Sequence, residues 1–435
     1  MSHQRRRPFA VRSYERSSPS APKIHPADQE AGRLFDLEER LSRTARRLPL
    51  LLLTLLCIPL ITLGLLLCLL PQKEFSPEEN RLLTTAPTFS VASLLDGTLT
   101  ADVSRMCADQ FPLRSQFIRA KAALELLLSK GQNNSVILGH DGYLITRPNT
   151  TKDQLSAAQK NLASVARFSR ALAQRKIPFV FAPVPRSIDV NQDKLPRLFD
   201  AADAARDVQK IREDATALGL TLYDLITPLR TAAEQGKAVW YRTDHHWTTL
   251  GAYVAYLSLA DSLGYEPYPL AAFEPDVVCT DFLGTTQAKS GMSWVDGDHI
   301  TLFRYEGDDR LQTEILDNGQ VTRHLDGLYD LSALDTHDKY SVFLGGTNTH
   351  IRVSAPQAPE AKTLLVIKDS FSQSLAPFLA RHFHLILIDP RTYSTQNEAI
   401  LSLAEREEAV AVLLLYGVDT LLEGHSLRVL EYGIP

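Results

Sequence analysis

The sequence predicts an α/β protein with a mostly parallel sheet, preceded by a single membrane-spanning helix. Segments with helical spacing alternate with short strands, and four strands are continuous apolar runs: FVFAPV (179–184), TLLVIK (363–368), LILID (385–389) and AVAVLLLY (409–416). Strands that are apolar throughout are buried on both faces, as in a parallel sheet covered by helices. The third observation is an uncharged run at 48–70. About 20 apolar residues suffice to cross a bilayer, so this run predicts the membrane-spanning helix.

The N-terminal region predicts a cytoplasmic basic tail and an anchor. Residues 1–47 are rich in Arg, Ser and Pro, which is typical of a mostly disordered tail. The run at 48–70 is longer than the apolar part of a signal peptide, and no small-residue cleavage site follows it. Lys and Arg are concentrated before the run, and such segments stay in the cytoplasm. We therefore expect a single-pass protein of the cytoplasmic membrane, with a transmembrane helix at 48–70 and residues 71–435 extracytoplasmic.

The net charge and the cysteine content limit which partners and covalent links are expected. The net charge of -5 gives no basic footprint for nucleic acid, so no nucleic-acid partner is expected. Cys57 and Cys68 lie in the apolar run, whereas Cys107 and Cys279 follow it. Cys107 and Cys279 can pair in an oxidising compartment, but two cysteines do not define a disulfide framework. Their pairing stays open.

The remaining elements are expected in the following order. Residues 71–130 predict an extended connector and two amphipathic helices broken at Pro112. Residues 131–435 predict one domain, which begins with a β-hairpin around His-Asp-Gly at 140–142. Gly, Asp, Thr and short alternating runs at about 270–360 predict an irregular β-rich insertion. Helices are expected at 153–175, 201–218, 228–236, 249–263, 373–382 and 399–407, and strands at 177–184, 220–225, 363–367, 385–388 and 409–416.

The densest group of titratable side chains lies in WYRTDHHWTT, residues 240–249. In an extended chain residues i and i+2 point the same way, so Asp244 is expected to meet His246, while His245 faces away from Asp244, toward structure or the rim of the pocket. Asp244 would then bond Nδ1 of His246 and leave Nε2 free as a base, with Trp247 as a wall of the site. Two other interpretations stay open.

The first alternative is a metal site formed by Asp244, His245 and His246 with a distant His299 or His350. The spacing lacks the His-x-x-x-His pair typical of helical zinc sites, so neither a metal nor a cofactor is expected. The second alternative is a capped helix start packed by Trp247.

Ser370 lies where a buried strand ends and a helix begins. Free backbone N–H groups at a helix start can stabilise an oxyanion, so this position suits a nucleophile. Helix capping by Asp369, Ser370 or Ser372 is an equal alternative. Strands of such sheets also end near their ligands. Lys368, Arg391 and Tyr416 lie at such ends; Lys368 is equally well a surface charge, and for Arg391 we favour a pair with Asp389 over binding of an anionic group.

Several motifs resemble one protein family in order along the chain. Thr243-Asp244-His245-His246-Trp247-Thr248 resembles the signature of the DHHW family of bacterial membrane-anchored proteins. It is also similar to the Asp-x-His-Trp motif of the alginate O-acetylation proteins, which resemble SGNH hydrolases. The resemblance covers about residues 74–435 and extends to ENR (79–81), DQFPLR (109–114), GHDGYL (139–144), FLGT (282–285), GGTN (345–348), IKDS (367–370) and IDPRTY (388–393).

The resemblance implies a three-layer α/β/α SGNH-like domain with a Ser-His-Asp triad. Ser370 would be the nucleophile, His246 the base and Asp244 the residue that orients the base. An Asn side chain and a Gly N–H complete the oxyanion hole in that superfamily, and Asn348 and Gly346 are the candidates here. A role for Asn348 as a β-turn residue is an equal alternative. Trp247, Arg391 and Tyr416 are expected to contribute to substrate binding.

The implied function is acyl transfer by a membrane-anchored extracytoplasmic serine enzyme. It would be an O-acetyltransferase or O-acetylesterase acting on a cell-surface or exported polysaccharide. For a transferase, the resemblance also implies a multi-span membrane acyltransferase as partner. The alternative is a non-catalytic glycan-binding or assembly subunit with the same fold, since a fold does not fix a function.

Overall fold

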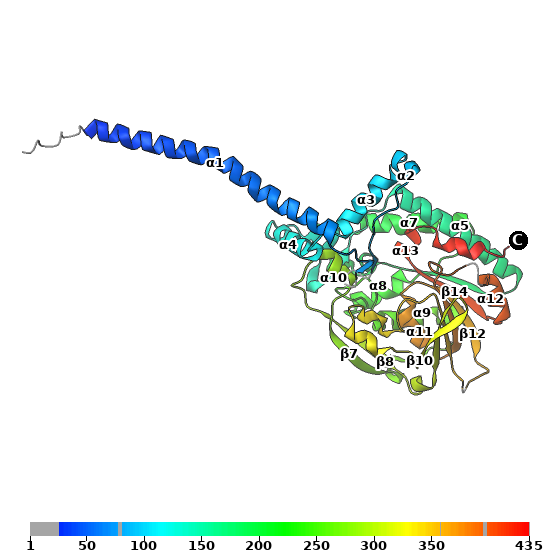
Figure 1. Cartoon of the computed structure of the whole chain (residues 1–435). Coiled ribbons are helices and arrows are strands. Elements are labelled where there is room, and N and C mark those ends of the chain that lie inside the picture. Colours follow the sequence, from blue (N-terminus) through cyan, green and yellow to red (C-terminus); the bar gives the residue numbers. More distant parts are fainter. Residues whose placement is uncertain (1–25, 77–80, 357, 395–397, 435) are drawn as a thin grey trace, which may run out of the picture. The chain divides into compact units, whose positions relative to one another are not determined.

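The structure, a computed structural model, describes residues 26–76, 81–356, 358–394 and 398–434. Its contacts divide the chain into two compact units, Met1–Pro71 and Gln72–Pro435. The described part of the first unit is essentially one long helix, α1 (Pro26–Leu69), drawn in blue in Figure 1. Within it, Arg47–Leu69 is long and apolar enough to cross a membrane, with a mean hydropathy of 2.8, and none of it is buried. The candidate membrane helix Arg47–Leu69 therefore coincides with the apolar run from which a membrane helix was predicted.

Residues 26–46, which belong to the region predicted as a mostly disordered tail, form the first part of α1. Their composition suits a helix, because Ala, Leu, Glu and Arg are strong helix formers. Residues 1–25 lie outside the described residues.

The second unit begins with short elements. Strands β1 (Phe75–Ser76) and β2 (Arg81–Leu82) pair, and helices α2 (Val91–Leu95), α3 (Thr98–Asp109) and α4 (Arg114–Leu127) follow. A small antiparallel sheet of β3 (Gln132–Asn133), β4 (Val136–Leu138) and β5 (Leu144–Thr146) comes next. The hairpin around His-Asp-Gly is thereby confirmed, and its turn needs Gly142 because φ there is 77°.

Cys107 and Cys279 are both free thiols.

A seven-stranded sheet forms the centre of the second unit, in the order β10-β9-β11-β13-β12-β14-β6. Strands β13, β12, β14 and β6 run parallel, whereas β11, β9 and β10 join antiparallel. The bounds are β6 (Phe179–Val184), β9 (Gln312–Asp317), β10 (Gln320–Asp326), β11 (His350–Ser354), β12 (Lys362–Lys368), β13 (Phe383–Ile388) and β14 (Ala411–Gly417).

The expected mostly parallel sheet is therefore a mixed one. All three antiparallel strands come from the segment 270–360, which was expected as an insertion. Strands β9 and β10 are joined by the short turn Asn318-Gly319, and such a turn can only connect antiparallel neighbours. The same segment also forms a separate pair, β7 (Glu274–Phe282) with β8 (Asp298–Arg304).

The helices of the second unit follow the expected order. They are α5 (Lys152–Gln174), α6 (Ser187–Val190), α7 (Ala202–Ala217), α8 (Ile226–Glu234), α9 (Thr249–Leu263), α10 (Thr285–Ser290), α11 (Ser372–Leu379), α12 (Ile400–Arg406) and α13 (Val418–Leu422). Short 3-10 turns lie at His140–Gly142, Gln192–Lys194, Leu270–Ala272, Asp308–Arg310, Leu331–Asp335, Lys339–Val342 and Ser426–Glu431. The strand expected at 220–225 is reduced to one bridge between Leu222 and Phe181.

Alternate residues of the parallel strands enter two apolar clusters. Leu364 and Val366 of β12 pack with residues of α8, α9 and α11, whereas Leu365 and Ile367 pack with residues of α5, α7 and α12. Strand β12 is thus buried through both sets of side chains, which explains why its sequence does not alternate between apolar and polar residues. The two sets of helices are labelled around the sheet in Figure 1.

Candidate active site

Ser370 lies in a tight turn between β12 and α11, beyond the carboxyl end of a central strand. The buried Asp369 holds this turn in place. Its Oδ1 accepts a hydrogen bond from the Phe371 N–H at 3.1 Å, and its Oδ2 accepts from the Gly417 N–H at 2.7 Å and the Thr420 hydroxyl at 2.9 Å. The serine is therefore fixed relative to the end of the neighbouring strand β14.

A tight loop before α9 carries the acid and the histidines. The loop closes on itself through a bridge between Trp240 and Trp247 and a hydrogen bond from the Tyr241 N–H to the His246 carbonyl at 3.2 Å. Thr248 then caps α9 by accepting from the Gly251 N–H at 3.1 Å. The residues between are in a non-helical loop, as the expected contact between an acid and a histidine two residues apart requires.

Asp244, His246 and Ser370 form one line of hydrogen bonds, as expected from the spacing. The distance from Nδ1 of His246 to Oδ1 of Asp244 is 2.5 Å, and that from Nε2 of His246 to Oγ of Ser370 is 2.7 Å. Asp244 and His246 are both buried. The two segments that meet here are 124 residues apart in the chain.

Helix α10 holds the other side of the Asp244 carboxylate. Oδ2 of Asp244 accepts from the backbone N–H of Thr285 at 2.8 Å and from its hydroxyl at 3.0 Å. Gly284 makes this approach possible, because a Cβ at that position would lie 2.3 Å from the Cβ of Asp244. These contacts fix the direction in which the carboxylate faces His246.

Aromatic rings hold the imidazole of His246. The Tyr340 ring stacks on it with centroids 3.9 Å apart and planes 7° apart, and the Phe371 ring meets it edge-on at 5.0 Å. The Tyr340 hydroxyl lies 2.9 Å from the hydroxyl of Ser374, in the helix that follows Ser370. Tyr340 comes from the segment 270–360, so that segment contributes to the site as well as to the sheet.

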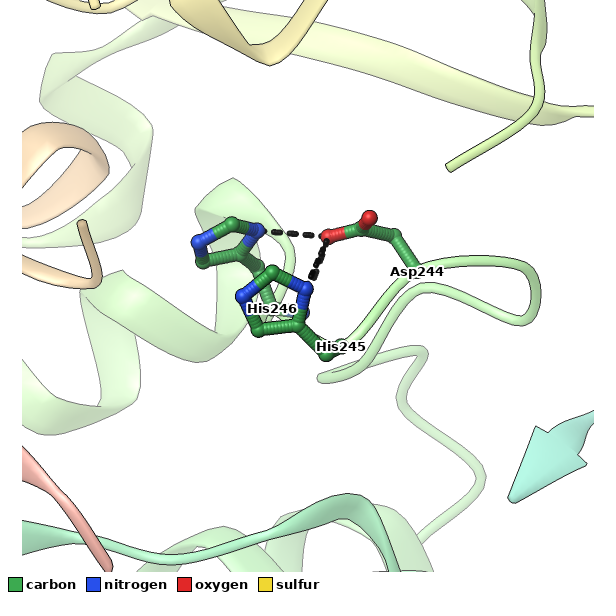
Figure 2. A group of neighbouring side chains, drawn as sticks. All are labelled: Asp244, His245 and His246. Carbon is green, nitrogen blue, oxygen red and sulfur yellow. Dashed lines mark hydrogen bonds and ion pairs between the residues drawn. The ribbon is translucent and has the colours of Figure 1, made fainter. Parts of the chain in front are cut away.

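His245 lines the cavity, as one of its two expected positions allows, but the expectation that it faces away from Asp244 is wrong. Its ring centroid lies 3.8 Å from that of His246, and its Nδ1 lies 2.6 Å from the Thr285 hydroxyl and 3.7 Å from Oδ1 of Asp244. Figure 2 shows both imidazoles turned toward the same carboxylate. The reason is that the loop bends at these residues, so neighbouring side chains do not alternate as they would in a strand.

Burial and charge separate the pKa values of the three groups. Burial and the neighbouring His245 lower the pKa of His246, although the charge of Asp244 opposes this. For His245 burial also acts downward, but the charge of Asp244 outweighs it and raises the pKa. For Asp244 burial acts upward, but the two histidines lower the pKa well below its usual range. At neutral pH these directions leave His246 neutral and Asp244 ionised, as a general base and its partner need to be.

Asp244, His245 and His246 also offer three metal-ligand atoms within 4.8 Å of one another. However, both ring nitrogens of His246 already face hydrogen-bond partners, Asp244 and Ser370. Among the described residues, the group does not include His299 or His350, which were considered as a distant fourth ligand. These contacts therefore suit transfer of a proton between Ser370 and His246 better than binding of a metal ion.

A cavity of about 540 Å³ opens beside Ser370. Its charged wall includes Lys289 of α10, Arg391 after β13, and Asp419 and Glu423 at α13. The remaining lining residues are Arg114, Leu144, Thr146, Val184, Pro185, Arg186, Ser187, Asp244, His245, Thr285, Thr286, Phe371, Gly417, Val418 and Thr420. This volume lies within the range of roughly 300–1,000 Å³ that is usual for small-molecule pockets.

Two basic residues of the wall are already paired with carboxylates. Arg186, which follows β6, is buried and bonds Asp189 at 3.0 Å and Asp207 at 2.9 Å. The Arg391 guanidinium donates two hydrogen bonds to Asp389, from Nε to Oδ1 at 2.9 Å and from Nη2 to Oδ2 at 2.6 Å. The favoured pair is therefore present, and the guanidinium also lines the cavity. Both guanidiniums are thus held rigidly in the cavity wall.

Five of the residues considered from the sequence are placed differently. The Asn348 side-chain amide donates to the carbonyls of Gly345 at 3.2 Å and Gly346 at 3.1 Å, and neither Asn348 nor Gly346 lines the cavity. The pair closes its own turn instead of facing Ser370. Lys368 is not a surface charge, because it is fully buried 3.9 Å from Asp389, and burial lowers its pKa to about 8.

Trp247 and Tyr416 also lie outside the cavity lining. Trp247 is fully buried and donates from Nε1 to the Phe371 carbonyl at 3.2 Å and the Ser374 hydroxyl at 2.9 Å, so it supports α11 from behind. Tyr416 is fully buried in the cluster with α5, and its hydroxyl lies 2.8 Å from that of Ser426. A residue at a strand end lies near the cavity. Whether its side chain faces the cavity depends on its position in the strand, because successive side chains point to opposite sides.

Sequence reasoning missed several residues that shape the site. Gly284 and Thr285 had a usable signal, since they belong to the block FLGT, but no role was assigned to them. Asp369 was considered only as a helix cap, whereas its buried carboxylate joins two strand ends. Tyr340 has no signal in the sequence, because its contact with His246 depends on how the segment 270–360 folds back.

Part of the chain is similar to a known family of SGNH hydrolase-like domains. Residues 136–292 match the family model described as the SGNH hydrolase-like domain of acetyltransferase AlgX. That range includes Asp244 and His246 and ends before Ser370, so the position of the serine rests on the geometry described above. The resemblance to the alginate O-acetylation proteins is confirmed.

Named relatives and solved structures agree with this class. The chain is 32% identical over 177 residues to the probable alginate O-acetylase AlgJ of Pseudomonas aeruginosa, covering 39% of this chain and 44% of that one. It therefore spans less than half the length of that relative. A DHHW family protein from Eubacterium siraeum has a TM-score of 0.54 at 18% identity, covering 68% of this chain and 95% of that one. PatB1 of Bacillus cereus, solved with a sulfonyl adduct, has a TM-score of 0.55 at 21% identity, with 68% and 99% covered.

Proposed function

We propose that this chain is a membrane-anchored extracytoplasmic serine O-acetyltransferase that acts on a polysaccharide. The observation that carries the proposal is the line of hydrogen bonds from Asp244 through His246 to Ser370 beside a cavity. A relative named as a probable alginate O-acetylase supports acetyl as the group and a polysaccharide as the acceptor. Ser370, His246 and Asp244 then form a catalytic triad in the roles expected from the sequence.

The triad accounts for the transfer in two steps. His246 Nε2 takes the proton of Ser370 as Oγ attacks the acetyl carbonyl, and Asp244 stabilises the imidazolium. The intermediate collapses to acetyl-Ser370 and the protonated leaving group of the donor. In the second step His246 takes the proton of an acceptor hydroxyl as that oxygen attacks the acetyl group. The ester bond to Oγ then breaks, and His246 returns the proton to Oγ of Ser370. The backbone N–H of Ser370, at the start of the eight-residue helix α11, is the proposed oxyanion donor in place of Asn348.

The membrane helix supports a transferase over an esterase. An esterase uses the same triad with water as acceptor, and nothing in that reaction needs an anchor. A chain held at the membrane can receive acetyl groups from a multi-span membrane acyltransferase, which we propose as its partner. The concentration of Lys and Arg before Arg47–Leu69 supports an N-terminus in the cytoplasm and a catalytic domain outside it.

The proposed domain scheme keeps a tail at 1–47, an anchor at 48–70, a connector with helices at 71–130 and a catalytic domain at 131–435. The division of the chain after Pro71 supports the boundary that follows the anchor. We also propose that the catalytic domain has three layers, α/β/α. The two apolar clusters, which take alternate residues of the same strands, support this arrangement.

A serine-directed fluorophosphonate probe tests the proposal. The detergent-solubilised full chain is expected to be labelled once, and Ser370→Ala and His246→Ala are each expected to abolish labelling. Ser354→Ala, a partly buried serine on β11, is the matched control and should label normally. A folded chain that resists the probe, or that is labelled equally in Ser370→Ala, would contradict the proposal and favour a non-catalytic glycan-binding subunit.

Turnover of p-nitrophenyl acetate separates transferase from esterase. Acetylated alginate-like polysaccharide should accumulate when the acceptor is present, and release of free acetate should fall correspondingly. Acetate that goes only to water at every acceptor concentration would leave an esterase and exclude the transferase.

A further inference from the structure

Helix α4 carries an apolar stripe on the side that faces solvent. The stripe consists of Leu113, Phe117, Leu124, Leu127 and Leu128, whose side chains are 50–82% exposed. Soluble surfaces usually scatter such residues singly, and a contiguous apolar patch marks a contact with a protein or a membrane. This side of α4 is therefore a candidate contact surface.

The opposite side of α4 is already occupied by the protein. Ala122 is buried there in a small cluster with Val136 and Leu144 of β4 and β5, and with Met292. At 3.6 residues per turn the stripe occupies a sector of about 100° on the side away from Ala122. A sector of that width is typical of an amphipathic helix that lies along an apolar phase.

The charges around the stripe are basic. Lys121 borders one edge and Arg119 lies beyond the other, and both are exposed. Arg114 opens the helix, and Glu125 is the single acid within its sequence. Glu125 lies 3.7 Å from both Lys121 and Lys130, so its charge is offset locally. A stripe of Leu and Phe between basic residues fits the headgroups and acyl chains of an anionic bilayer surface.

We propose that α4 lies in the interface of the membrane that holds the proposed anchor, with its stripe among the acyl chains and its basic residues at anionic headgroups. The inference rests on the proposed anchor, because the candidate span in the same chain ends at Leu69, shortly before α4. A bilayer is therefore always within reach of this helix, whereas a soluble partner would have to be recruited.

This placement has a consequence for the cavity. Arg114, the first residue of α4, lines the cavity beside Ser370. A membrane-bound α4 therefore sets one wall of the cavity at the bilayer surface. An acetyl group delivered from within the membrane then reaches Ser370 without the catalytic domain detaching.

Tryptophan quenching by lipids with brominated acyl chains tests the inference. The full chain is reconstituted into vesicles of phosphatidylglycerol and phosphatidylcholine in equal parts, in a Trp294→Phe background, because Trp240 and Trp247 are buried. Leu124→Trp reports α4 and Leu60→Trp reports the anchor. Val321→Trp, an exposed apolar residue, is the matched control, because its strand β10 is drawn away from α4 in Figure 1.

The emission that Leu124→Trp or Leu60→Trp adds to that of the Trp294→Phe background is expected to fall by about twofold or more in brominated vesicles, while the emission added by Val321→Trp stays within about a tenth. Vesicles of phosphatidylcholine alone should weaken the quenching at Leu124→Trp and leave that at Leu60→Trp unchanged. Quenching at Leu60→Trp without quenching at Leu124→Trp overturns the inference while the anchor stands. In that case a dimer detected by mass photometry would assign the stripe to a second copy. Quenching at neither position overturns both.

Discussion

Two adjacent histidines share one carboxylate but face different partners. His246 is enclosed by Tyr340 and Phe371 and bonds Ser370, whereas His245 is half exposed in the cavity and bonds Thr285. The charge of Asp244 raises the pKa of His245, so His245 takes up its proton first as the pH falls. A protonated His245 then lowers the pKa of His246 and keeps the base neutral over a wider range of pH.

His245→Asn tests this coupling. Without the neighbouring positive charge, the pKa of His246 should rise, so the acid limb of the kcat/KM profile for p-nitrophenyl acetate should move to higher pH. The plateau rate should fall far less than the roughly 10²–10⁴-fold that loss of a general base costs. His299→Asn, an exposed histidine outside the cavity, should leave the profile unchanged. An acid limb that stays in place or moves to lower pH would contradict the coupling.

At the scale of elements, one buried carboxylate joins the two strand ends that form the site. Asp369 follows β12, yet it accepts hydrogen bonds from Gly417 at the end of β14 and from Thr420 in α13. The end of β12 thus carries the serine, and the end of β14 continues into the cavity wall. Displacement of either element would change the position of Ser370 relative to His246.

Asp369→Asn should weaken this junction. One acceptor oxygen becomes an N–H₂ group that faces the Gly417 N–H, so a charge-assisted hydrogen bond is lost and a buried donor is left unpaired. We expect the free energy of unfolding to fall by about 2–3 kcal/mol, and the rate to fall by about 10²-fold because a shift of about 1 Å suffices. Denaturant unfolding of the solubilised chain and p-nitrophenyl acetate turnover measure the two effects.

The control for this junction is Asp317→Asn, an exposed carboxylate at the end of β9. It should change the free energy of unfolding by less than about 0.5 kcal/mol. Equal effects of the two substitutions would show that Asp369 does not hold the site together.

The elements also show what the sequence can and cannot predict. Apolar runs such as TLLVIK identify buried strands, and the spacing of Asp244 and His246 identifies a contact between them, because both depend on local geometry. The antiparallel β9, β10 and β11 were not foreseen, since short alternating runs do not reveal which sheet they join. Asn348 was misplaced for a related reason: a motif gives the order of residues, but the turn decides where the amide points.

At the scale of the whole molecule, two features would hold the catalytic domain at the membrane. The candidate span in α1 would be an irreversible anchor, whereas an interfacial helix such as α4 binds reversibly. The two features therefore predict different behaviour when the anchor is removed, and this difference can be measured in cells.

The full chain is expected in the membrane pellet after an alkaline carbonate wash, and a chain that lacks residues 1–71 is expected in the supernatant. Alkaline phosphatase, which is active only outside the cytoplasm, should be active when fused after Pro435 and inactive when fused after Arg46, because the Lys- and Arg-rich tail stays inside. A fusion active only after Arg46 would reverse the orientation and place Ser370 in the cytoplasm, where an exported polysaccharide is out of reach. A full chain removed by carbonate would show instead that Arg47–Leu69 does not cross the bilayer.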